Sequence, residues 1–88
     1  MPGVARKDLD TAGGVAIEGS ENVFVNGYGV VRIGDKVASH GLTPPHTPTP
    51  PMIEGSTNVF VNGIGVVRAG DRANCNHTIT GSSNVSVN

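Results

Sequence analysis

Apolar residues occur in this chain as short runs rich in valine, and polar Asn-Gly pairs stand between one run and the next. The first complete run covers residues 22–25, continues through Asn26-Gly27 and returns through residues 30–32. In a strand, Phe24 would face the side opposite to its two valine neighbours. Asn-Gly between β-branched runs is typical of a two-residue hairpin turn, because both residues tolerate positive φ. The pattern predicts a β-hairpin here.

The same pattern is repeated along the chain. Residues 17–37 read IEGSENVFVNGYGVVRIGDKV and residues 53–73 read IEGSTNVFVNGIGVVRAGDRA, which are identical at 16 of 21 positions. A truncated third copy, ITGSSNVSVN, spans residues 79–88, and a partial unit spans residues 4–14. Self-similarity at a fixed period indicates one supersecondary unit packed against its copies. We predict a mainly β protein, one domain over residues 1–88, with three quasi-equivalent hairpin blades around one axis and the termini side by side.

Composition limits how such a fold can be stabilised. The chain has 88 residues with 13 Gly, 6 Pro, 2 Phe, 1 Tyr and no Trp, so its core is small and long helices are disfavoured. A single cysteine cannot form an internal disulfide, so a metal or a partner is expected to stabilise the fold.

Charge and hydropathy exclude two classes of partner. The net charge is −1, with six basic and seven acidic residues scattered singly, so no basic stripe is present for nucleic acid. The sequence shows no signal-peptide pattern and no apolar run near the roughly 20 residues that a membrane helix needs. We expect synthesis in the cytoplasm.

Two non-repeated inserts, residues 38–52 and 74–78, carry the candidate chemistry. Each follows a Gly-Asp turn, so a rotary arrangement would bring both to the same end of the molecule. They contain all three histidines and the only cysteine: His40, His46, Cys75 and His77. Three imidazoles and one thiolate form a typical ligand set of a closed zinc site, with iron as the alternative metal. The other interpretation is that the histidines are solvated loop residues and the cysteine a small buried apolar group.

The combined pattern resembles the PAAR (proline-alanine-alanine-arginine) repeat family. The resemblance covers residues 4–88 and rests on the unit N-V-F-V-N-G-x-G-V-V-R-x-G-D followed by His or Cys residues. Gly-Val-Val replaces Pro-Ala-Ala in both copies, so only Arg32 and Arg68 keep the motif literally. Many members have His-Gly-Gly where residues 12–14 read Ala-Gly-Gly.

The resemblance implies a small conical fold with a metal near its apex, held by the four residues named above. It also implies a non-enzymatic tip that caps and sharpens the spike of a type VI secretion system or a contractile phage tail, and so aids membrane piercing. The partner would be a homotrimeric β-helical spike (VgrG-like, or a phage spike) that binds one copy through the blunt base. The target membrane would be contacted mechanically, after assembly on the machine and outward delivery.

The hairpins would supply the spike-binding base, since three similar surfaces on one chain match the three equivalent ends of a trimer. Exposed strand edges would continue the β-helix by strand addition. The expected contacts are Val23, Phe24, Val25, Asn26 and Tyr28 in the first copy, Val59, Phe60, Val61, Asn62 and Ile64 in the second, and Val85 and Val87 in the third.

Two other functions stay open at this point. A zinc hydrolase would use a metal-bound water with Asp35, Asp71 or Glu54 as the base. A metal-free β-repeat packing module would need no metal at all. We expect Arg32 and Arg68 to brace their turns by pairing with the nearby aspartates or with backbone carbonyls.

Overall fold

The computed structural model describes residues 1–88 and contains three two-stranded antiparallel sheets and no helix, so no helix that could cross a bilayer is present. The strands are β1 (Thr11–Ala12), β2 (Gly14–Val15), β3 (Phe24–Val25), β4 (Tyr28–Gly29), β5 (Phe60–Val61) and β6 (Ile64–Gly65). They pair as β1–β2, β3–β4 and β5–β6. The mainly β fold predicted from the sequence is confirmed.

The two Asn-Gly turns have the conformation that the sequence predicts. Asn26 and Gly27 have φ values of 55° and 84°, and Asn62 and Gly63 have values of 55° and 77°. Positive φ at both central residues is the requirement of a type I′ turn, whose twist matches that of the flanking strands. These turns set the register within each hairpin, which pairs Phe24 with Gly29 in the first copy.

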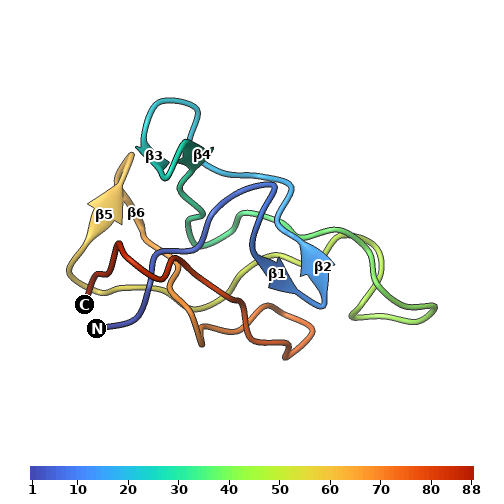
Figure 1. Ribbon diagram of the computed structural model, residues 1–88. Helices are drawn as coiled ribbons and strands as arrows, with labels where there is room; N and C mark the ends of the chain where they lie inside the picture. The colour runs from blue at the N-terminus through green and yellow to red at the C-terminus, as the bar shows by residue number, and fades with distance from the viewer.

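The third hairpin is assembled from both ends of the chain. Gly3 pairs antiparallel with Ser86, and the backbone N–H of Val87 donates to the carbonyl of Pro2 at 3.0 Å. The two termini consequently lie side by side (Figure 1). The predicted arrangement of three hairpin blades with the termini side by side is therefore confirmed.

A ring of backbone hydrogen bonds joins the three blades around the axis. Val31 donates to the carbonyl of Ala5 (3.0 Å), Ala5 to that of Val67 (3.0 Å), and Val67 to that of Val31 (2.9 Å). All three side chains are fully buried. The sequence pattern predicted that residues 31 and 32 continue their own hairpin, and this was wrong. The backbone groups of Val31 bond to the neighbouring blades. Arg32 lies opposite Val66 of the next blade, while its own N–H and carbonyl bond to Asp35.

The apolar core is small. Only 22 of 88 residues are buried, and the ten-residue main cluster contains alanine, valine, methionine, isoleucine and Cys75 but no aromatic side chain. A core of this size supplies little stability beyond the conformational entropy of folding. Other stabilising interactions are needed, and the backbone hydrogen bonds between the blades are one of them.

The two ends are built differently. The molecule measures 33 × 23 × 23 Å. The β3–β4 and β5–β6 hairpins and both termini gather at one end, which we call the base, whereas β1–β2 and the two inserts lie toward the other end, the tip (Figure 1). The longer insert forms the yellow-green loop that projects farthest from the hairpins (Figure 1).

Candidate metal centre and base surface

The fold brings the four sequence-predicted metal ligands together at the tip. One donor atom from each of His40, His46, Cys75 and His77 lies within 4.8 Å of the other three donor atoms. His40 and His46 come from the long insert, and Cys75 and His77 from the short one. No carboxylate belongs to this group. Three imidazoles and one sulfur in this arrangement could bind a metal ion.

Two of the donor separations match a tetrahedral site. Nε2 of His40 lies 3.3 Å from Sγ of Cys75 and 3.3 Å from Nδ1 of His46. Zinc bonds of about 2.0–2.1 Å to nitrogen and 2.3 Å to sulfur place neighbouring donors of a tetrahedron roughly 3.3–3.6 Å apart. The donor set and these separations therefore fit zinc.

The His40 ring is oriented by a contact outside the cluster. Its Nδ1 lies 2.9 Å from the backbone carbonyl of Ala38, which can only accept a hydrogen bond. Nδ1 must therefore carry the ring proton of the neutral imidazole, and Nε2 presents a lone pair to Cys75 and His46. Such outer contacts fix the tautomer and the ring orientation of metal-binding histidines.

Backbone hydrogen bonds within and between the inserts hold the ligands in place. The N–H of His40 donates to the carbonyl of His46 at 3.1 Å, which closes the long insert on itself. The N–H of Ala73 donates to the carbonyl of His77 at 2.9 Å, which does the same for the short insert. Asn74 donates to Pro51 at 2.8 Å and ties the two inserts together. The loops are thus folded around the cluster by their own backbone.

The cluster is covered on one side and open on the other. Cys75 is only 5 % exposed and belongs to the main apolar cluster, whereas His77 is exposed and His40 and His46 are half-buried. The sulfur therefore joins the cluster to the apolar core, and the three imidazoles lie nearer to the surface.

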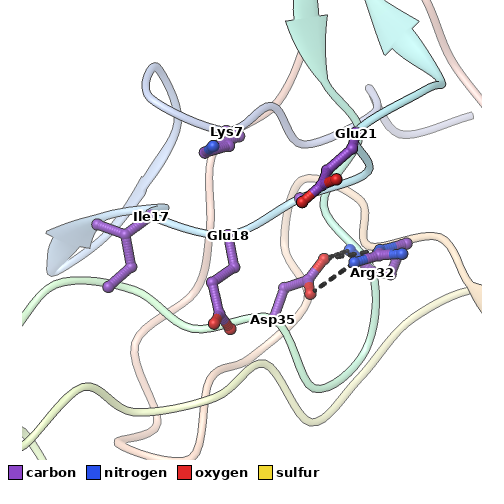
Figure 2. Close-up of a pocket in the computed structure, with 7 residues that line it drawn as sticks. Lys7, Ile17, Glu18, Glu21, Arg32 and Asp35 are labelled. Carbon is purple, nitrogen blue, oxygen red and sulfur yellow. Dashed lines mark hydrogen bonds and ion pairs between the residues drawn. The ribbon is translucent and has the colours of Figure 1, made fainter.

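The candidate hydrolytic bases are engaged elsewhere. Asp35 pairs with Arg32 at 2.9 Å and Asp71 with Arg68 at 3.0 Å, as the sequence predicted. Figure 2 shows the first of these pairs at the edge of an open groove of about 350 Å³ that is lined mostly by charged residues.

Glu54, the third candidate base, is held by Arg72. It accepts a hydrogen bond from the Arg72 guanidinium at 2.9 Å, and this bond lowers the pKa of the carboxyl group below its usual value. None of the three candidate bases is therefore free to act at the cluster.

A third Arg-Asp pair was not predicted from the sequence. Arg6 pairs with Asp10 at 2.8 Å, but the two are four residues apart instead of three. Asp8 has a φ of 66°, and Gly34 and Gly70, which hold the same place in the other two turns, also have positive φ. Burial opposes ionisation of Asp10, but hydrogen bonds from Arg6 and Thr80 outweigh it and hold the pKa of this carboxyl below its usual value. The sequence similarity of Val4-Ala5-Arg6 to residues 30–32 could have predicted this pair. Asp10 was missed because it stands four residues after the arginine instead of three.

The base carries an apolar hollow on the pseudo-threefold axis. It has a volume of about 140 Å³ and is lined by valine alone. The nine lining residues, three from each blade, are Val4, Val23, Val25, Val30, Val59, Val61, Val66, Val85 and Val87. An exposed apolar hollow of this kind is a candidate interaction surface.

The larger apolar residues of the hairpins lie outside this hollow. Phe24 and Phe60 are 58 % and 57 % exposed, and Tyr28 and Ile64 are each 39 % exposed. The predicted opposition of Phe24 to its valine neighbours is therefore confirmed. The predicted contact residues thus divide into an inner valine set and an outer set on the flanks of two hairpins.

Asn26 fastens the first hairpin to the third blade. Its Oδ1 accepts hydrogen bonds from Ser82 Oγ at 2.8 Å and Arg6 Nη1 at 3.2 Å, and its Nδ2 donates to Asn84 at 3.1 Å. The residue thus has a turn-forming role and an inter-blade role at once.

Asn62 makes the equivalent contacts between the second hairpin and the first blade. Its Oδ1 accepts hydrogen bonds from Ser20 Oγ at 2.9 Å and Arg32 Nη1 at 3.0 Å, and its Nδ2 donates to an asparagine of that blade at 3.1 Å. At the remaining junction, the guanidinium of Arg68 bonds only to Asp71. Two of the three junctions are therefore fastened by an asparagine.

Comparison with known proteins agrees with this geometry. The family model described as PAAR motif matches residues 6–81 of the 88-residue chain. No curated protein sequence matches the chain. The matched region includes two complete repeats, both inserts and all four clustered side chains. Membership of this family is consistent with a spike-tip protein of contractile injection systems. The family is a structural module and not an enzyme family. The chain belongs to the PAAR motif family.

Proposed function

We propose that this protein is the metal-stabilised tip that caps and sharpens the trimeric β-helical spike of a contractile injection machine. The observation that carries the proposal is that one small chain has both a symmetric apolar base and a tip with a cluster of candidate metal ligands. The base offers nearly the same valine surface three times, and the tip gathers four nitrogen and sulfur donors. A single chain can satisfy three identical partners only by such internal repetition.

The base would dock on the end of the spike. Its hollow of about 140 Å³ is suited to apolar side chains, one from each spike chain, that fill it along the common axis. Exposed strand edges of the hairpins would continue the β-helix by hydrogen bonding. One copy would then bind each spike trimer.

The metal would stabilise the tip, which holds few apolar residues of its own. Binding of a metal to a site that forms only in the folded state contributes its free energy to folding. Zinc is the expected ion because neutral imidazole and thiolate suit it, and iron is the alternative. A stiff tip would serve a mechanical role against the target membrane, after assembly on the spike and outward delivery.

The test is a binding experiment with a purified β-helical spike trimer from the same source. Light scattering after size-exclusion chromatography should give a complex of one cap and three spike chains. The Val61→Asp variant should fail to bind while keeping its metal content. Failure of the unmodified, metal-loaded protein to bind the trimer would contradict the proposal.

A further inference from the structure

The β1–β2 hairpin lies against the metal cluster although it contributes no side chain to it. Its turn residue, Gly13, has a φ of 80°. A Cβ atom added at Gly13 would lie 2.5 Å from Cδ2 and 2.6 Å from Nε2 of His40, and 2.8 Å from Cδ2 of His77. These separations are shorter than any real carbon contact, so the backbone of Gly13 packs directly on both imidazoles.

We propose that the β1–β2 hairpin is a wall of the metal centre and that Gly13 is a positioning residue for His40 and His77. The inference rests on the proposed metal centre. Gly13 has no side chain, so the hairpin backbone supports one imidazole from each insert at the same time.

The His40 ring cannot avoid a side chain at Gly13 by turning away. Its Nδ1 is held by the carbonyl of Ala38 at 2.9 Å, and its Nε2 faces Cys75 at 3.3 Å. Gly14, the next residue of the hairpin, has its own Cβ position 3.1 Å from Nδ1 of His40. The ring is thus supported by the hairpin, by a carbonyl and by the cluster, and a shift of Nε2 would move it from the bonding distance that zinc requires.

The chain contains a matched control for the strain that any side chain meets at positive φ. Gly63, in the turn of the β5–β6 hairpin at the base, has a φ of 77°, and a Cβ atom added there would meet nothing within 4 Å. Gly13→Ala and Gly63→Ala therefore carry nearly the same backbone cost. Only Gly13→Ala pushes against the imidazoles.

The test compares zinc release and cobalt spectra of the two variants. Gly13→Ala should release zinc to a chromogenic chelator at least tenfold faster than the unmodified protein, and its cobalt-substituted form should show shifted visible absorption bands. Gly63→Ala should match the unmodified protein in both measurements. Equal zinc release and equal spectra for Gly13→Ala and Gly63→Ala would overturn the inference and leave the metal centre itself intact.

A second measurement needs no variant and holds if Gly13→Ala does not fold. In the zinc-loaded protein, nuclear Overhauser effects should connect the Gly13 Hα protons with the Hδ2 protons of His40 and His77. The absence of both effects would overturn the inference. If the unmodified protein bound no metal, both the inference and the proposed metal centre would fail.

Discussion

The base is built by repetition of one unit, and the tip is built from three different segments. At the base, three copies of one hairpin pattern surround an axis, and nine valines from them line a single hollow. At the tip, the symmetry is lost: the three corresponding segments are a long insert, a short insert and the β1–β2 hairpin. The comparison shows that repetition and variation serve different ends of one chain. Repetition produces a symmetric valine surface, and variation places three histidines and one cysteine at one point.

Removal of the metal should have the largest effect and should act mainly on the tip. Chelation should destabilise the protein by several kcal/mol or unfold it, since binding free energy at such a site is folding free energy. Thermal unfolding followed by circular dichroism measures the loss, and hydrogen exchange should show the inserts losing protection first. The Cys75→Ala variant should behave like the chelated protein even with excess zinc. An unchanged melting temperature after chelation would favour the metal-free packing module.

A charge in the valine hollow should affect the base alone. Val61→Asp would bury an unpaired carboxylate under the docked spike, and we expect at least a hundredfold loss of affinity for the trimer. The matched control is Leu42→Asp, because Leu42 is 99 % exposed in the long insert at the opposite end. Calorimetric titration of both variants measures the difference. If Leu42→Asp weakened binding as much as Val61→Asp, the base would not be the docking surface.

Acid should weaken the hydrogen bonds that Asp10 accepts from Arg6 and Thr80. The pKa of this carboxyl is lowered in the folded protein, so its contribution is present above the unfolded pKa of about 3.9 and is lost as the pH falls through the folded value. Asp10→Asn should cost about 1.5–3 kcal/mol at neutral pH, as expected for charged hydrogen bonds. Urea unfolding of both proteins from pH 7 to pH 3 tests this. A constant difference between them down to pH 3 would contradict the assignment.

The smallest expected effect concerns the asparagines that fasten the blades. Asn26→Ala and Asn62→Ala should each cost about 1–2 kcal/mol through lost hydrogen bonds and turn geometry. Asn88, in the corresponding place of the third copy, makes no comparable bonds to Arg68, so Asn88→Ala should cost almost nothing. Urea unfolding of the three variants provides the comparison. A loss from Asn88→Ala as large as the other two would show that the third junction is also fastened.

The base was easier to predict from the sequence than the tip. Asn-Gly turns and a 36-residue offset are local or periodic signals, so they revealed the hairpins, the closure of the termini and the Arg-Asp pairs of the two full copies. The alternation of valine and phenylalanine also separated the inner from the outer face. The pairing of residues 31 and 32 across blades was not foreseen, because a local pattern does not say which strand is the partner.

At the tip, the sequence predicted the four candidate ligands that the fold brings together, but not the hairpin that packs against them. The chain has three histidines and one cysteine, and all four lie in the two corresponding inserts. The contact of Gly13 with two imidazoles could not be predicted from the sequence. A glycine in a turn is usually explained by its backbone conformation, so the residue type does not indicate a packing role. Asp10 escaped notice because one added residue changed its spacing from Arg6.

X-ray absorption spectroscopy of the metal-loaded protein tests the central claim most directly, because it counts the ligands of a single ion. The account predicts one metal per chain with three nitrogen ligands at about 2.0–2.1 Å and one sulfur ligand at about 2.3 Å. A metal-free protein, or a coordination shell made of oxygen atoms without sulfur, would contradict it.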